Sequence, residues 1–278
     1  MRTRAITGVL FVLVMIASVL AGAPTFGFFY LMLSLLCLKE FNKLSKQAGN
    51  KPNEVLGYVN CVVIYAAFAL LNYKASLPNP GDFTFQVNKF FFILPVTLGG
   101  IFVAELFKTN DKPFANIGFT FLGIIFATLP WSFFHALAYA GNGFNNHIPM
   151  AFLIMLWSND TGAYLSGRWL GRTKLFERHS PKKTWEGFFG GVLIAAIAGY
   201  VLSIFFTELT WNVWVSMAVI IGCVGTLGDL VESMFKRSLN IKDSGGILPG
   251  HGGLLDRFDG LLLAAPVVYS YLYFISNS

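Results

Sequence analysis

Residues 187–206 read GFFGGVLIAAIAGYVLSIFF, a run of 20 residues that contains no Asp, Glu, Lys or Arg. About 20 apolar residues are enough for a helix to cross the hydrocarbon core of a bilayer, so this run predicts a transmembrane helix. Small residues recur in it every four positions, at Gly187, Gly191, Ala195 and Gly199. Small residues at this spacing let a second helix approach closely, and we therefore expect tight helix packing on this face.

The rest of the chain has the same apolar character. Of the 278 residues, 55% are hydrophobic and 12% are charged, whereas soluble domains carry roughly 25% charged residues. We predict an all-α polytopic integral membrane protein with about nine transmembrane helices. The apolar runs of near-spanning length cover residues 5–22, 24–38, 55–73, 90–107, 116–140, 149–167, 187–206, 212–231 and 258–275.

The first two runs follow each other with almost no gap. Arg2 and Arg4, an apolar core and an Ala-Gly-Ala sequence are also features of a signal peptide. Because Pro24 and another apolar run come directly afterwards, we favour a helical hairpin that turns at Gly22–Thr25.

The distribution of basic residues predicts how these helices are oriented. Cytoplasmic segments of membrane proteins are enriched in Lys and Arg. With a cytoplasmic N-terminus and an external C-terminus, the cytoplasmic segments hold 18 of the 20 Lys and Arg residues. These segments are 1–4, 39–54, 108–115, 168–186 and 232–257.

The positions of the charges and of the apolar runs also predict which partners the protein has and how its helices are grouped. The net charge of +6 is concentrated in two loops, and neither resembles a nucleic-acid-binding motif, so we expect no nucleic-acid partner. We divide the chain into three groups of helices. Residues 1–88 hold about three spans, residues 89–186 hold the middle helices and a basic cytoplasmic loop, and residues 187–278 hold the C-terminal helices with the polar site.

The first polar cluster is WSNDTGAYLSGRWLGR, residues 157–172, at the end of the sixth run. Polar side chains at a membrane boundary are costly and are candidates for function. Thr161 and Ser166 fit equally well as polar contacts between helices. Asp160 does not, because a lone carboxylate needs a partner or water. Asn159 shares a helical face with small residues and joins Asp160 as a candidate for substrate binding.

The second cluster is HSPKKTWEGFFGG, residues 179–191. Ser180 and Pro181 form a good N-cap and first-turn pair, so we expect a helix to start here. Lys182 and Lys183 then lie in its first turn, where the helix dipole favours anions and not cations. A bound phosphate would resolve this conflict. Ordinary positive-inside anchoring is the alternative explanation for the two lysines.

The third cluster joins the end of the eighth run to the start of the ninth. Asp229 and Glu232 are three residues apart on one helical face, and Glu232 is four residues before Lys236, a spacing typical of an intrahelical ion pair. Asp256 and Asp259 share a face of the ninth run. Two helix ends would thus present carboxylates to one cytoplasmic pocket, and oxygen ligands of this kind suit Mg²⁺.

The segment between these helix ends, KRSLNIKDSGGILPGHGGLLDRFD at 236–259, combines cations with glycines. Glycine pairs at 245–246 and 252–253 allow the backbone to approach a ligand closely. The cations are suited to phosphate groups, and Arg in particular to bidentate contacts. The segment is therefore typical of a phosphate-handling site. Its cationic side chains are Lys236, Arg237, Lys242 and Arg257.

With these residues in place, the chain resembles the phosphatidate cytidylyltransferases, also called CDP-diacylglycerol synthases. The run SMFKRSLNIKDSGGILPGHGGLLDRFD, 233–259, is similar to that family's signature, and the NDTGAYLSGR and SPKKTWEG runs resemble its upstream elements. The resemblance covers about residues 155–260. The signature positions are filled by Ser233, Lys236, Arg237, Lys242, Asp243, His251, Gly252, Gly253, Asp256, Arg257 and Asp259.

The resemblance implies a nucleotidyltransferase that condenses CTP with phosphatidic acid to give CDP-diacylglycerol and pyrophosphate. It also implies Mg²⁺ dependence, room for a monovalent cation such as K⁺, a homodimer, and a place in the inner (cytoplasmic) membrane with the site facing the cytoplasm. Asp229 and Asp256 would be the metal carboxylates, and the loop cations would hold phosphates. His251 is open between a general base and a phosphate or loop contact.

Together these arguments predict three sets of site residues. The metal ligands are Asp229, Asp256 and Asp259. The catalytic residues are Asp229, Asp256, Lys236, Arg237, His251 and Arg257. The substrate-binding residues are Asn159, Asp160, Ser180, Lys182, Lys183, Ser233, Lys242, Asp243, Gly252 and Gly253.

Three other functions compete with this one. A CTP-dependent polyprenol kinase would share the nucleotide and the membrane, but its acceptor is an alcohol and needs fewer cations. A transporter would place its ionisable groups near the bilayer midplane, often in repeated halves. A structural protein that binds anionic lipid would need basic loops but no aspartates at metal-binding spacing.

Overall fold

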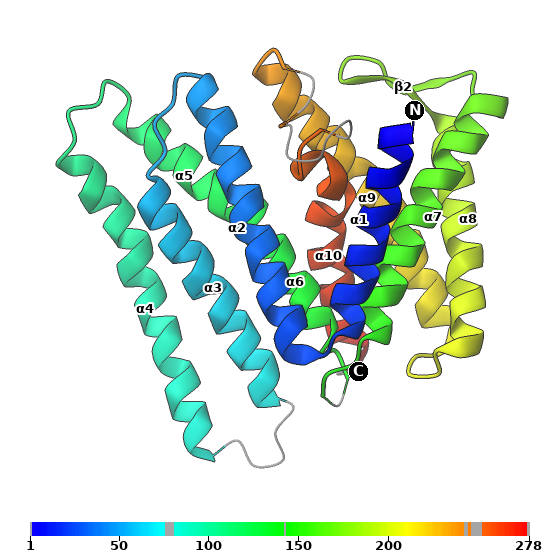
Figure 1. The fold of residues 1–278 in the computed structure, drawn as a ribbon, viewed down its shortest axis with the longest axis horizontal. Helices are drawn as coiled ribbons and strands as arrows, with labels where there is room; N and C mark the ends of the chain where they lie inside the picture. The colour runs from blue at the N-terminus through cyan, green and yellow to red at the C-terminus, as the bar shows by residue number, and fades with distance from the viewer. Residues whose placement is uncertain (1, 76–80, 142, 242–243, 246–251, 277–278) are drawn as a thin grey trace. The chain divides into compact units, whose positions relative to one another are not determined.

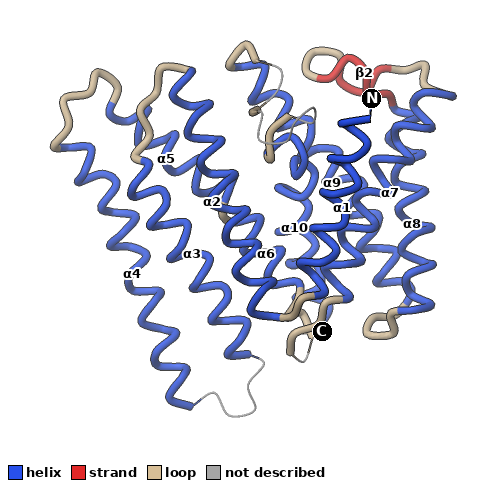
Figure 2. Tube along the Cα trace, in the orientation of Figure 1, coloured by secondary structure: helices blue, strands red, loops and turns tan. Residues whose placement is uncertain are grey.

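Helices form nearly all of the regular structure in the computed structural model, which describes residues 2–75, 81–141, 143–241, 244–245 and 252–276. Of residues 2–5, 75 and 81–90, only the backbone is described. These parts contain ten α-helices and one two-stranded sheet (Figures 1 and 2). The chain divides into two compact units, residues 1–144 with 244–255 and residues 145–243 with 256–278.

The first unit is built from six helices. Within it, α2, α3 and α4 run side by side, and α2 and α3 also pack on α5 and α6 (Figure 1). Only Thr128 separates α5 from α6, so that Pro113–Leu137 forms one apolar segment where a single span was predicted. The helices are α1 (Arg2–Leu20), α2 (Ala23–Gln47), α3 (Glu54–Ala75), α4 (Gly81–Leu106), α5 (Pro113–Ala127) and α6 (Leu129–Leu137).

The turn predicted after the first apolar run is confirmed. α1 ends at Leu20 and α2 begins at Ala23, with Gly22 between them at a φ of 89°, which favours glycine. The hydroxyls of Ser18 and Tyr30 hydrogen-bond across the two helices at 3.1 Å. Tyr30 also lies against the buried ring of Trp131, with ring centroids 5.6 Å apart. An aromatic core therefore holds α2 to α6.

In the second unit, the predicted small-residue face of α8 packs against both α7 and α9. The buried residues of α8 are Gly187, Gly191, Ala195 and Gly199, which confirms that face. A Cβ on Gly199 would lie 2.9 Å from the Trp214 carbonyl oxygen of α9, so the two backbones are close. The elements are α7 (His147–Leu170), β1 (Lys174–Phe176), β2 (Ser180–Thr184), α8 (Trp185–Phe205), α9 (Trp211–Ser238) and α10 (Leu255–Ser276).

Six helices in the described part of the chain are long and apolar enough to cross a membrane. Two shorter apolar helices, Ile6–Leu20 and Phe91–Leu106, accompany them, and α7 falls in neither group. The predicted helical architecture with several candidate membrane spans is thus confirmed. The six segments are Ala23–Gln47, Glu54–Lys74, Pro113–Leu137, Trp185–Phe205, Trp211–Ser238 and Leu255–Ser276.

The prediction that a helix starts at Ser180 and Pro181 is wrong. Residues 180–184 form strand β2, which pairs antiparallel with β1 in a short hairpin (Figure 2). The helix begins at Trp185, and its N-cap is Thr184, whose Oγ1 accepts a hydrogen bond from the Gly187 amide at 3.2 Å. A proline is also tolerated in an edge strand, because its missing N–H is not needed there, so Ser-Pro alone did not distinguish the two structures.

Candidate functional site

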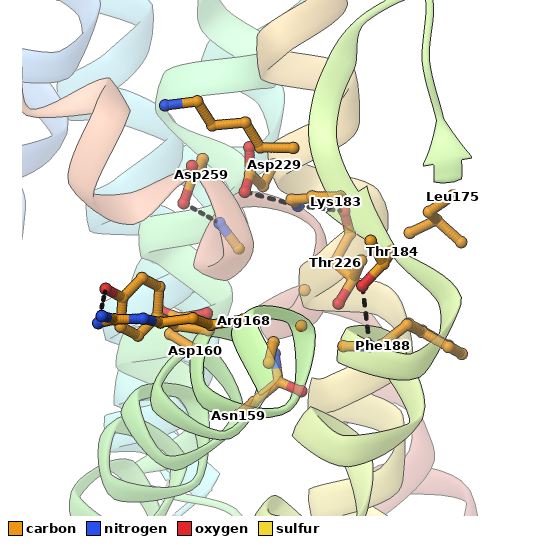
Figure 3. A pocket seen from close by; sticks show the side chains of 17 residues that line it. Asn159, Asp160, Arg168, Leu175, Lys183, Thr184, Phe188, Thr226, Asp229 and Asp259 are labelled. Carbon is orange, nitrogen blue, oxygen red and sulfur yellow. Dashed lines mark hydrogen bonds and ion pairs between the residues drawn. The ribbon is translucent and has the colours of Figure 1, made fainter. Parts of the chain in front are cut away.

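A cavity of about 390 Å³ opens in the second unit, at the level of the β1–β2 hairpin (Figure 3). Residues of α7, the hairpin, α8, α9 and α10 line it, so it gathers segments that are up to about a hundred residues apart in the sequence. Its walls combine small residues with charged ones. They are formed by Asn159, Asp160, Ala163, Tyr164, Gly167, Arg168, Leu175, Lys182, Lys183, Thr184, Gly187, Phe188, Gly225, Thr226, Asp229, Asp259 and Gly260.

Three carboxylates from three helices line this cavity: Asp160 of α7, Asp229 of α9 and Asp259 of α10. α9 and α10 meet there through glycines, since a Cβ on Gly225 would lie 3.7 Å from the Gly260 Cα. The Gly260 amide donates to Asp259 Oδ1 at 2.7 Å (Figure 3). Close helix packing thus brings carboxylates of α9 and α10 to one space.

The hairpin supplies two lysines to the same cavity. Lys183 Nζ lies 2.6 Å from Asp229 Oδ2 and donates to the Thr226 carbonyl oxygen at 3.4 Å (Figure 3). Its neighbour Lys182 is exposed at the cavity wall. Asp229 also accepts from the Ser233 hydroxyl at 3.2 Å, one helical turn away. A basic strand and an acidic helix therefore face each other across the site.

Asn159 is the most deeply buried polar residue of the cavity wall, with 2% of its surface exposed. Its Oδ1 has no hydrogen-bond partner among the described residues. A Cβ on Gly191 would lie 2.8 Å from this oxygen, and one on Gly222 would lie 3.0 Å from it. The glycines of α8 and α9 thus make the room in which the amide side chain sits.

A second ionic cluster lies at the end of α9. Lys236 pairs with Glu232 on its own helix, which confirms the predicted intrahelical pair. Its Nζ also lies 2.5 Å from Asp256 Oδ1, in the first turn of α10. The side chains are nearly dry, with 11% of Lys236, 1% of Glu232 and 8% of Asp256 exposed. Asp256 is therefore held by Lys236 and does not line the cavity.

The other predicted site residues are spread along the same segments. Arg237 and Arg257 are exposed, and Arg237 donates to the Ile241 carbonyl oxygen at 3.0 Å. Ser180 is the first residue of β2. Gly252 has a φ of 85°, and Gly253 is buried. Outside the described residues lie Lys242, Asp243 and His251.

The donor set of the cavity fits a hard divalent cation. Carboxylate oxygens from Asp160, Asp229 and Asp259 are ligands that Mg²⁺ prefers. Within the described ranges, no three His, Cys, Asp or Glu side chains converge closely enough to form a complete metal site. Mg²⁺ commonly keeps several waters and takes substrate phosphates as ligands, so an incomplete protein site matches its chemistry.

Sequence reasoning did not select several wall residues of the cavity. Tyr164 and Arg168 follow Asp160 at intervals of four residues, and Arg168 Nη1 donates to the Tyr164 hydroxyl at 3.3 Å. This spacing on one helical face was a signal that could have identified them. Thr226 gives no comparable signal, because a threonine in an apolar helix is usually a packing residue.

Comparison with known proteins covers almost the whole chain. Residues 2–275 match the sequence profile of the cytidylyltransferase family. A phosphatidate cytidylyltransferase of Staphylococcus haemolyticus is 32% identical over 274 residues, which is 96% of this chain and 97% of that protein. Proteins of the same name from Staphylococcus epidermidis and Staphylococcus aureus are each 32% identical over 270 residues, with the same coverage of both chains.

Proposed function

The chain belongs to the cytidylyltransferase family, and on that premise we propose that it transfers CMP from CTP to phosphatidic acid. A phosphate oxygen of the lipid forms a bond to the α-phosphorus of CTP, the bond from that phosphorus to the β-phosphate oxygen breaks, and pyrophosphate leaves. The products are CDP-diacylglycerol and pyrophosphate. The observation that carries the proposal is the cavity in which two lysines face three carboxylates between apolar helices.

The residues of the cavity divide this task between them. Lys182 and Lys183 are placed to counter phosphate charge, and a phosphate would compete with Asp229 for the Lys183 ammonium group. One or two of the carboxylates of Asp160, Asp229 and Asp259, together with waters and substrate phosphates, would hold Mg²⁺, which when bound neutralises charge on the phosphates. Transfer between phosphates depends mainly on positioning and charge neutralisation, so this set needs no strong base.

The second ionic cluster supports the same site from outside the cavity. Lys236 fixes Asp256 at the start of α10, while Arg257 beside it stays exposed. We assign Arg237 and Arg257 to phosphate binding, because both are exposed and guanidinium groups bind phosphate in a bidentate way. The distribution of charges along the chain also supports a cytoplasmic site, since 18 of the 20 Lys and Arg residues fall on one predicted side.

The test is a turnover assay on detergent-purified protein with phosphatidic acid, Mg²⁺ and CTP labelled at the α-phosphate. We expect label in the lipid fraction from the wild type and from Asp111→Asn, an exposed aspartate of the first unit. Asp229→Asn should lower the rate about 100-fold or more, because it removes an anionic ligand for the Mg²⁺ that would neutralise charge on the reacting phosphates. EDTA should abolish transfer.

Other results would redirect the proposal. No labelled lipid from folded wild-type protein that binds CTP would overturn it, and transfer from γ-labelled CTP to a polyprenol would establish the kinase instead. The resemblance also predicts a homodimer and a monovalent-cation site, and each can be tested by a separate measurement. A homodimer should appear in the mass of the detergent-solubilised protein, and a monovalent-cation site should appear as K⁺ dependence of the rate.

A further inference from the structure

Glu40, near the C-terminal end of α2, is a buried carboxylate that the proposed reaction does not use. Only 3% of its surface is exposed, and an ionised carboxylate in such a place requires strong hydrogen bonds. Its Oε2 accepts a hydrogen bond from the backbone amide of Leu255 at 2.8 Å, across 215 residues of sequence. Leu255 is the first residue of α10, so Glu40 binds an amide at a helix N-terminus, where negative charge is stabilising.

Two glycines of the signature segment also lie directly against this carboxylate. A Cβ on Gly245 would overlap Glu40 Oε1 and lie 3.0 Å from its Cδ, and a Cβ on Gly253 would overlap the same oxygen. Ser244, beside Gly245, is buried with 2% exposed. Residues 245 and 253 thus converge on one side chain of α2, and at these two positions glycine is required by close contact.

We propose that Glu40 is a positioning residue for the signature segment, and that its carboxylate fixes the residue at which α10 begins. Arg257 lies in the first turn of α10 and Asp259 lies one turn after Leu255, and the roles assigned to these two residues rest on the proposed function. A helix whose first amide is held has a defined direction for the side chains of its first turn. Glu40 therefore acts on the reaction through the backbone of Leu255, without touching the substrate.

The experiment compares Glu40→Ala and Glu40→Gln with Glu105→Gln. Glu105 is a matched control, because it is equally buried at 3%, lies in the same unit, and accepts hydrogen bonds from Asn110 and Asn116 away from the signature segment. Amide hydrogen exchange of a peptide covering residues 252–262 reads the backbone directly. Turnover with CTP and phosphatidic acid, measured across Mg²⁺ concentrations, reads the consequence for the site.

Glu40→Ala should exchange about tenfold faster in this peptide, because the Leu255 amide loses a charged acceptor. Its kcat should fall about tenfold or more, because Asp259, the proposed Mg²⁺ ligand of α10, is directed by the start of that helix, and half-maximal activity should need more Mg²⁺. Glu40→Gln retains an amide oxygen that can accept the same bond, so it should recover most of both properties. Glu105→Gln should change neither exchange at 252–262 nor the Mg²⁺ requirement.

Two results would overturn the proposal. The first is unchanged exchange at residues 252–262 in folded Glu40→Ala protein. The second is faster exchange with an unaltered kcat and Mg²⁺ requirement, which would leave Glu40 as a stabilising residue of its unit only. If the wild type itself does not turn over CTP and phosphatidic acid, the proposed function fails, while the exchange data still decide whether Glu40 holds α10.

Discussion

Replacing Lys236 with methionine should destabilise the protein strongly, because one lysine serves two buried carboxylates. The exposed fractions are 11% for Lys236, 1% for Glu232 and 8% for Asp256. Breaking a buried ion pair by removing one partner costs about 3–5 kcal/mol. A separate argument gives a similar figure, since protonating an ordinary aspartate at pH 7 costs about 4 kcal/mol. At about 2–4 °C per kcal/mol, the melting temperature should fall by about 6 °C or more.

The assay is thermal unfolding of the purified protein in one detergent, followed by circular dichroism at constant heating rate. Arg237→Met is the matched control, because Arg237 is the next residue of α9, is exposed, and donates to the Ile241 carbonyl oxygen just beyond the helix. It should change the melting temperature little. Adding Glu232→Gln to Lys236→Met should restore part of the loss by removing one unpaired charge. Equal melting temperatures for the two methionine variants would refute the account of a shared buried lysine.

Three further outcomes are expected. Gly191→Ala should cost about 1–3 kcal/mol of stability, because the added Cβ would overpack the contact between α7 and α8. Gly118→Ala is the control and should not destabilise the protein, because a Cβ there would meet no atom within 4 Å. Thermal unfolding measures both variants. Burial raises the pKa of Glu208, but hydrogen bonds from Asn145 and His147 outweigh it and hold the pKa below 4.5. The stability lost in Glu208→Gln should thus be evident at neutral pH and vanish as the pH falls below 4.5. Withdrawing Mg²⁺ from saturated protein with EDTA should lower the melting temperature, since ligand at 100 times its Kd contributes about 2.7 kcal/mol.

The helices could be predicted from sequence because their apolar runs are long and local. Their ends could not. α2 runs to Gln47 and α9 to Ser238, beyond the predicted ends at 38 and 231, because polar residues in the last turns are buried against distant partners. Glu40 binds an amide 215 residues away. A hydropathy profile predicts that polar residues such as Glu40 are exposed to solvent. No local sequence pattern indicates that a hydrogen-bond partner lies elsewhere in the chain.

The candidate site could be predicted in part for the same physical reason. Asp229 and Asp259 were expected in one pocket because each sits at the polar end of an apolar run, and both line the cavity. Glu232 and Lys236 were paired by helical spacing. Asp256 also pairs with Lys236, but this contact depends on how α9 packs against α10. Residue spacing within one helix cannot predict it.

The two units are interleaved along the chain, since residues 244–255 complete the first unit after residues 145–243 of the second have been made. Ribosomes add about 5–20 residues per second. The interval between synthesis of Glu40 and synthesis of Leu255, 215 residues later, is therefore roughly 10–40 s. During biosynthesis α2 must therefore enter the membrane with this acidic side chain lacking that donor. A nascent chain stopped before residue 244 contains helices α1 to α6 of the first unit but lacks residues 244–255, which also belong to that unit.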